Sequence, residues 1–212
     1  MAVRMVYRRT DHMANRLADK RARILRAARG IVAEDGWASA TVANVALRAD
    51  VAAGTIYRYW PSKAELSVEV VETVSAREVG VVRAIAASDE APLEKLTAAI
   101  RTFSVRALRG RRLAYALIAE PIDPEVEQVR LIYRAQLVGC FEQILEEGRR
   151  RGVFASQAPA VAAACIVGAL MEALIGPLAL ATGRGKEVDR QLVAEIIRFC
   201  VTASVGTSAV TA

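Results

Sequence analysis

A chain of 212 residues can bury a sizeable core without disulfides or a structural metal. Its few aromatic residues (5%) and its sparse Gly and Pro favour long aliphatic helices over strands and turns. The formal net charge of +6 lies in the first third, because residues 1–63 contain 12 Lys or Arg and 5 Asp or Glu whereas residues 64–212 contain 17 and 18. A basic segment joined to a neutral body indicates that a polyanion binds at one end, since basic residues that served solubility alone would be spread evenly.

The N-terminal third predicts a short arm followed by three helices. Residues 1–14 are basic and lack apolar periodicity, so we expect a flexible arm. Apolar residues at helical spacing then predict a first helix that ends near Asp35, before Gly36. A second helix begins at Thr41, whose hydroxyl can cap it, and a short third helix covers about residues 52–59.

The remaining chain predicts long helices only. Ser62 and Glu65 form a capping box at the start of the fourth helix, and Pro92 suits the first turn of the fifth. The later helices are predicted over about residues 62–87, 92–110, 125–151, 159–182 and 187–202. We find no strand pattern and no internal repeat, so we predict an all-α fold. Its parts are the arm (1–14), a three-helix helix-turn-helix domain (15–63) and a C-terminal helical domain (64–212).

One apolar stretch is long enough to span a bilayer. Between Arg151 and Arg184 the only charged residue is Glu172, but the stretch is rich in Ala and Gly, and Pro159 and Pro177 flank its core. A charge in mid-span is costly in lipid, so we predict a buried helix and no membrane contact.

The three cysteines, Cys140, Cys165 and Cys200, lie in apolar helical stretches without the spacing of metal ligands. An odd number of such residues indicates reduced thiols in a cytoplasmic protein, although a redox sensor remains an alternative. No hydrophobic run follows the N-terminal charges, so we expect no secretory signal.

From Arg23 to Leu66 the chain reads RILRAARGIVAEDGWASATVANVALRADVAAGTIYRYWPSKAEL. This segment resembles the DNA-binding domain of the TetR family along its whole length, most closely from Ala53 to Lys63, which corresponds to the recognition helix and the start of the next helix. The resemblance implies a sequence-specific transcriptional regulator, with repression as the expected activity. Activation, or DNA binding without any small-molecule effector, is the alternative.

The resemblance also assigns roles to individual residues. The phosphate-binding residues would be Thr41, Tyr57, Tyr59 and Lys63, and the residues that approach base edges would be Ala53, Gly54 and Thr55. The alternative for the two tyrosines is that they pack against neighbouring helices.

Three departures from the family pattern affect DNA binding. Ala43 stands where Arg is frequent, Asp50 replaces the usual turn glycine, and Ala52 replaces a frequent serine, which removes a side-chain cap from the recognition helix. Direct base readout should therefore be sparse. We expect a larger contribution from Arg48, Arg58 and the basic arm, with minor-groove contacts from the arm as a hypothesis.

One recognition helix makes too few contacts for useful specificity, so we expect a homodimer on a near-palindromic operator. By resemblance, the last two helices of each subunit would form a four-helix bundle. The expected interface residues are Ala162, Cys165, Ala169, Ala173, Gly176, Leu192, Ile196 and Phe199. The alternative is that residues 159–182 form an ordinary core helix of a monomer.

Members of this family usually bind a small molecule among their middle helices, so the C-terminal domain would bind ligand as well as dimerise. Candidate lining residues for a mainly apolar effector are Phe103, Leu117, Ile118, Tyr133, Leu137, Phe141, Met171 and Glu172, each of which could instead be ordinary core. The carboxylate of Glu172 would meet a cationic ligand or, more in keeping with a buried charge, pair with Arg106, Arg130 or Arg134.

An enzyme is the rival class. The chain has one histidine, His12, in the predicted arm, and the run from Gly183 to Lys186 is too short for a nucleotide-binding loop. We therefore expect no enzymatic activity, no cofactor and no metal. A purely architectural DNA binder is the second rival, and it would lack a ligand-sized cavity.

Overall fold

The computed structural model describes residues 2–155, 157–179 and 185–205, with side chains from Leu17 onward. The described residues form helices and no strand, which confirms the all-α prediction. The helices are α1 (Ala2–Asp35), α2 (Val42–Arg48), α3 (Ala53–Tyr57), α4 (Lys63–Ala86), α5 (Pro92–Arg109), α6 (Arg111–Ile118), α7 (Pro124–Arg150), α8 (Pro159–Ala179) and α9 (Lys186–Val205).

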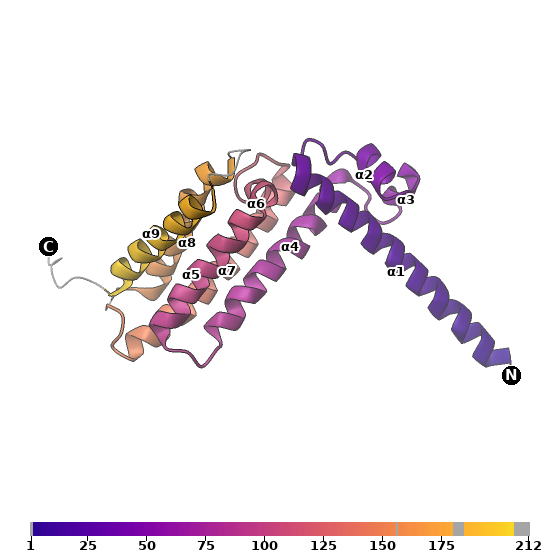
Figure 1. Ribbon diagram of the computed structural model, residues 1–212. Helices are drawn as coiled ribbons and strands as arrows, with labels where there is room; N and C mark the ends of the chain where they lie inside the picture. Colours follow the sequence, from indigo (N-terminus) through magenta and orange to yellow (C-terminus); the bar gives the residue numbers. More distant parts are fainter. Residues whose placement is uncertain (1, 156, 180–184, 206–212) are drawn as a thin grey trace.

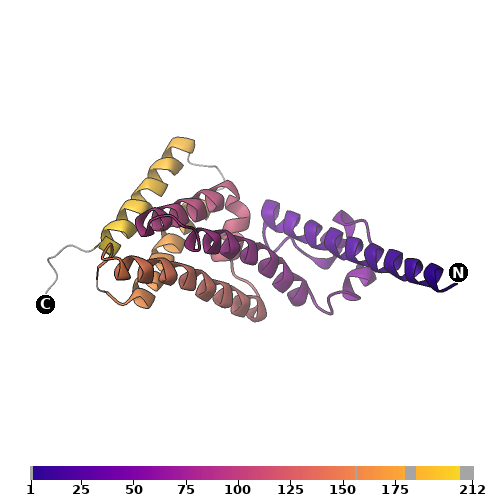
Figure 2. The same ribbon diagram turned by 90° about the horizontal axis from the view of Figure 1, so that it is seen from below.

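The molecule has two parts joined by α4. One part, which we call the head, consists of α1, α2, α3 and the first turns of α4, and the other, the body, consists of the rest of α4 and α5–α9 (Figure 1). The same division is visible from below in Figure 2.

The head has its own apolar core. Ile24 and Val32 of α1, Val45 of α2 and Ile56 of α3 are at most 1% exposed. A five-residue helix such as α3 is not stable alone, so its place depends on burying Ile56 against the other helices.

The head core continues into α4. Leu66, Val70 and Val71 belong to it, whereas Val79 and Val82 further along the same helix belong to the body core. The predicted boundary between residues 63 and 64 thus falls at the start of a continuous helix whose first turns pack with the head.

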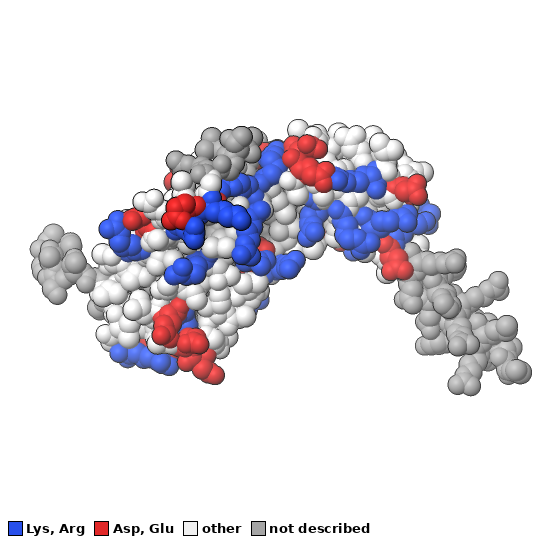
Figure 3. Space-filling view, in the orientation of Figure 1, with Lys and Arg blue, Asp and Glu red and all other residues white. Residues whose placement is uncertain are grey.

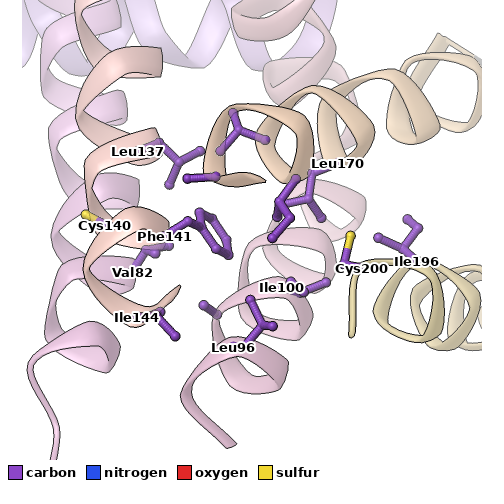
Figure 4. Packing of buried hydrophobic residues seen from close by; sticks show 14 of the residues in the cluster. Val82, Leu96, Ile100, Leu137, Cys140, Phe141, Ile144, Leu170, Ile196 and Cys200 are labelled. Carbon is purple, nitrogen blue, oxygen red and sulfur yellow. The ribbon is translucent and has the colours of Figure 1, made fainter. Parts of the chain in front are cut away.

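The body core lies between α4, α5, α7, α8 and α9. Phe141 of α7 is fully buried at its centre, close to Leu96 and Ile100 of α5 and Leu170 of α8 (Figure 4). Aliphatic residues dominate this core, as the composition predicts.

The predicted flexible arm (residues 1–14) is helical over its described residues 2–14. The structure continues α1 upstream to Ala2, and the N-terminal half of this helix extends away from the rest of the molecule (Figure 1). Residues 2–16 contain no Gly or Pro and several good helix formers, so the helix extends even though these residues show no apolar stripe.

Of two helices in the body, the sequence predicts α8 but not α6. The short helix α6 is not predicted, and Gly110, at φ −104° and ψ 41°, separates it from α5. Among the described residues, α8 alone is long and apolar enough to cross a membrane, with a mean hydropathy of 2.0. Its buried residues pack in the body core, as predicted, and Pro177, which lacks a backbone N–H, lies in its last turn.

Candidate nucleic-acid interface and ligand cavity

The turn between α2 and α3 is built from a cap and one left-handed residue. The backbone N–H of Asn44 donates to Oγ1 of Thr41 over 3.1 Å, which confirms Thr41 as the cap of α2 and leaves its hydroxyl proton free to donate. Asp50 has a φ of +50°, the conformation expected for the residue that replaces a turn glycine. At the start of α3, Ala52 provides no side-chain cap.

The start of α3 is an open, nearly bare surface. Ala53 and Gly54 are exposed, Thr55 is half-buried, and a Cβ placed on Gly54 would have no atom within 4 Å. No contact among the described residues requires glycine at this position, so the missing side chain would serve to let another molecule approach the backbone closely.

Donor groups flank this surface. Tyr57 is 52% exposed, and Arg58 and Lys63 are also exposed. Lys63 is the first residue of α4, where unpaired backbone N–H groups favour an anion. Arg58 has no ion-pair partner among the described residues, so its charge is available to a ligand.

Two candidate DNA-binding residues are instead held by the head itself. The hydroxyl of Tyr59 donates to the backbone oxygen of Leu17 over 3.4 Å, so this tyrosine packs toward α1. Arg48 pairs with Glu34 over 2.5 Å, and this hydrogen bond lowers the pKa of Glu34 below its ordinary value. In the free protein Arg48 therefore points back toward α1.

One cluster that stabilises the head is not evident from the sequence. Glu69 of α4 accepts from Nε1 of Trp60 over 2.6 Å and from Arg21 of α1 over 2.5 Å, and the Arg21 guanidinium lies 5.2 Å from the Trp60 ring centroid. These contacts fix the segment just after α3 to both neighbouring helices. No spacing rule identifies them, because Arg21 lies on a different helix far from Glu69 in the sequence, and Trp60 lies outside the helix that holds Glu69.

Positive side chains gather over the head. In the face shown in Figure 3, Lys and Arg cluster along the described part of α1 and beside α3, with few acidic residues among them. This distribution agrees with the charge excess of residues 1–63 and favours a polyanion as the partner of the head.

The body contains a cavity of about 140 Å³. Six of the candidate lining residues border it: Phe103, Leu117, Ile118, Tyr133, Leu137 and Met171. Phe141 and Glu172 do not. Phe141 lies one turn beyond Leu137, inside the solid core, and Glu172 is rotated by about 100° from Met171 around α8, toward the outer surface.

Three arginines, Arg106, Arg130 and Arg134, are among the polar residues that line the cavity. Arg106 makes two hydrogen bonds with Glu78, each of 2.6 Å. Arg130 is 8% exposed and donates to Glu127 and to the backbone oxygens of Ala116 and Glu120. The predicted pairing of Glu172 with an internal arginine is therefore wrong, because Arg106 and Arg130 already have other partners and Glu172 lies outside.

Helix α6 connects the cavity to the head. The backbone oxygen of Ala116 accepts from Nε1 of Trp37, in the head, over 2.8 Å and also from Arg130, in the cavity wall. Leu113 and Leu117 line the cavity and also pack against the head core. A ligand that shifts α6 would thus act directly on the head.

Arg112 strengthens this junction. Its guanidinium donates to Glu120 over 2.6 Å and to the backbone oxygen of Asp35 over 3.1 Å. It lies against Gly36, whose φ of +85° ends α1, and a Cβ there would come within 1.5 Å of the guanidinium.

The outer faces of α8 and α9 leave apolar residues uncovered. They border a shared groove, in which Phe199 is 65% exposed beside Ala169, Ala173 and Leu192, while Ile196 at its floor is 6% exposed. Cys165 and Gly176 of α8 are also exposed, and Ala162 is half-buried. Glu172 borders this groove, so an acidic side chain interrupts its apolar surface.

The cysteines differ in environment. Cys140 and Cys200 are buried, and burial raises the pKa of both thiols, that of Cys200 to about 11. Cys165 is exposed. Among the described residues, no cluster of three or more His, Cys, Asp or Glu could hold a metal ion.

Comparison with known proteins accounts for both parts of the chain. The family model of "Bacterial regulatory proteins, tetR family" matches residues 24–70, and that of "Tetracyclin repressor-like, C-terminal domain" matches residues 89–174. The chain is 43% identical over 58 residues to the HTH-type transcriptional repressor KstR of Rhodococcus jostii, and 48% identical over 50 residues to that of Mycobacterium tuberculosis. These matches cover 27% and 24% of this chain and 27% and 23% of the two relatives.

Solved structures share the fold over most of this chain. The fatty acid degradation regulator FadR of Bacillus halodurans has a TM-score of 0.73 at 22% identity, covering 86% of this chain and 94% of that one. FadR of Bacillus subtilis, in complex with stearoyl-CoA, has a TM-score of 0.70 at 21% identity, covering 86% and 98%. At this level of identity the likeness shows a common fold.

Proposed function

Because this chain belongs to the TetR family of bacterial regulatory proteins, we propose that it is a homodimeric transcriptional repressor of the cytoplasm. It binds a near-palindromic operator through its two heads and leaves the operator when a small molecule enters the body cavity. The observation that carries this proposal is the open surface at the start of α3, where Gly54 has free space beside it and donors on either side.

The head supports DNA binding by its chemistry. Ala53 and Gly54 let the start of α3 come close to base edges, while the hydroxyls of Thr41 and Tyr57 and the charge of Lys63 reach the phosphates. Few side chains remain for base readout, so specificity depends on the spacing of two heads and on the shape of the duplex.

The body supports dimerisation and sensing. The groove between α8 and α9 would bring Phe199 into contact with a second copy and remove this large side chain from water. The cavity meets α6, which contacts the head, so occupation of the cavity can change the placement of the head. FadR of Bacillus subtilis, which shares this fold, was solved in complex with stearoyl-CoA, and this supports an organic effector here.

The test is a selection of operator sequences. The full chain is incubated with fragments of the genome that encodes it, and retained fragments are sequenced. We expect enrichment of one near-palindromic sequence, and a reporter driven by that sequence should be silenced by the protein. Activation of the reporter would instead favour the alternative of an activator, and retention of fragments without any common sequence would favour an architectural DNA binder.

A further inference from the structure

We propose that the effector is a compact organic anion, with an apolar group about the size of a six-membered ring and one carboxylate that pairs with Arg134 at the edge of the body cavity. This inference deepens the proposed function and rests on the cavity being the effector site.

The cavity is walled by apolar side chains from several helices. Phe103 of α5, Leu113 and Ile118 of α6, Leu137 of α7 and Met171 of α8 all border it. Such a wall favours a hydrocarbon group, whose transfer from water is worth roughly 25 cal/mol per Å² of buried apolar surface.

The charges of the lining favour an anion over a cation. Among the described residues that border the cavity, Glu78 alone is acidic, and both of its carboxylate oxygens accept from Arg106, at 2.6 Å each. A cationic ligand would have to break this bidentate pair, and it would also meet the positive charges of Arg130 and Arg134. The cavity thus opposes the cationic effector that the sequence position of Glu172 suggested.

Arg134 is the arginine available to a ligand. Arg106 is held by Glu78, and Arg130 is held by Glu127 and two backbone oxygens, with only its buried Nε left without an acceptor among the described residues. Arg134 borders the cavity, is exposed, and makes no ion pair with the residues that the structure describes. It lies one helical turn after Arg130 on α7, so both guanidinium groups favour negative charge at the same edge of the cavity.

The volume limits the apolar group. A cavity of about 140 Å³ is close to the roughly 150 Å³ of an engineered protein cavity that binds benzene. An unbranched chain of 18 carbons would extend beyond this space, so the volume favours a compact ring over a long-chain acyl group.

The experiment compares ligands that share a ring and differ in charge. Isothermal titration calorimetry and thermal shift of the full-length protein are carried out with benzoate, benzyl alcohol and benzylamine, with cyclohexanecarboxylate as a second acid and stearate as a long one. We expect the two small acids to bind with a Kd of about 1 mM or tighter. Benzyl alcohol should bind about tenfold more weakly, and benzylamine should not bind.

Two variants, each of which loses one positive charge, test where the carboxylate of the ligand binds. Arg134→Gln should weaken benzoate binding about tenfold and leave benzyl alcohol binding unchanged. Arg101→Gln, on the exposed side of α5 and away from the cavity, is the control and should leave both unchanged. Neither substitution should alter operator affinity without ligand, because neither residue lies in the head.

The outcomes separate this inference from the function on which it rests. Equal binding of acid and alcohol, tighter binding of the amine or of stearate, binding by none of the small acids, or an Arg134→Gln protein that binds benzoate normally would each overturn the anion proposal. If the wild-type protein still binds its operator in that case, the proposed function stands without it. A protein that binds benzoate as expected but binds no operator would instead overturn the proposed function, and the cavity would remain an anion site.

Discussion

Gly54 is the residue whose substitution tests the DNA-binding surface of the head most sharply. Replacing Gly54 by Ala adds a methyl group to open space, so the free energy of unfolding should stay unchanged or rise by up to about 1 kcal/mol. If the backbone of α3 lies against the duplex, the same methyl group should weaken operator binding about tenfold or more. Chemical denaturation and fluorescence anisotropy measure the two effects.

Gly80→Ala is the matched control for that substitution. Gly80 is an exposed residue of α4 with equally open surroundings, far from the start of α3. It should gain stability in the same way and keep full operator affinity. A Gly54→Ala protein that binds the operator as tightly as Gly80→Ala would show that the backbone of α3 does not lie against the duplex.

Asp50 allows a second residue-scale test, based on its φ of +50°. A left-handed backbone costs an ordinary L residue roughly 1–2 kcal/mol and costs glycine almost nothing. Urea denaturation should therefore find Asp50→Gly about 1 kcal/mol more stable than Asp50→Ala.

In the control, glycine is expected to be less stable than alanine. Ala194 is an exposed residue inside α9, so Ala194→Gly should lower the free energy of unfolding by about 1 kcal/mol. If Gly and Ala were equally stable at position 50, the turn between α2 and α3 would not require a left-handed residue.

At the scale of single elements, α6 joins the ligand cavity to the head. Trp37→Phe removes the indole donor to the Ala116 carbonyl and should lower the free energy of unfolding by about 1–2 kcal/mol. Because this bond links α6 to the head, we also expect the ligand to change operator affinity severalfold less in this variant than in the wild-type protein.

The chain supplies a matched control in its only other tryptophan. Trp60→Phe removes the donor to Glu69, inside the head and away from α6, so it should cost a similar stability but leave the effect of ligand on operator affinity intact. Benzoate, or another ligand identified by thermal shift, serves as the probe. Equal coupling in the two variants would contradict a role for α6.

Local signals predict most of these elements. The caps at Thr41 and Ser62 depend on neighbours three positions away, and helical periodicity acts over one or two turns, so both can be read from sequence. The extent of α1 is underestimated because helix propensity continues where the apolar stripe stops. The end of α5 near Gly110 is predicted, but the separate helix α6 is not, because its eight residues span little more than two helical turns.

The residues of the cavity and of the head can be predicted only in part, because some of their contacts depend on tertiary packing. The composition of the cavity wall follows from apolar residues on the middle helices, and six of the eight candidates border it. Which side of α8 faces inward depends on tertiary packing, so the sequence misplaces Glu172. The contacts of Glu69, Arg130 and Trp37 join residues distant in sequence, and no local pattern encodes them.

At the scale of the whole molecule, the groove between α8 and α9 predicts the oligomeric state. Phe199→Glu places a charge on the apolar surface that we assign to the dimer, so sedimentation should show a shift to monomer, and operator affinity should fall by about a hundredfold or more. Leu93→Glu, on the exposed start of α5 and outside that groove, should remain dimeric.

Thiol labelling gives an independent measure of the same interface. Cys140 and Cys200 should resist maleimide in the native protein, because burial raises the pKa of both thiols. Cys165, exposed in the single chain and expected at the interface, should react faster as the protein is diluted and faster still in Phe199→Glu. A labelling rate that is independent of concentration would place Cys165 outside the interface.

The measurement that tests the central claim most directly is the salt dependence of binding to the selected operator, to one half-site and to a scrambled duplex. Two heads, each with Arg58 and Lys63 on phosphates, predict that log K falls against log salt concentration with a slope of about −4. The full operator should bind about a thousandfold more tightly than the scrambled duplex, and the half-site should lose most of that preference. Equal affinity for all three duplexes, or an affinity that salt does not change, would contradict a dimeric repressor that reads DNA through its head.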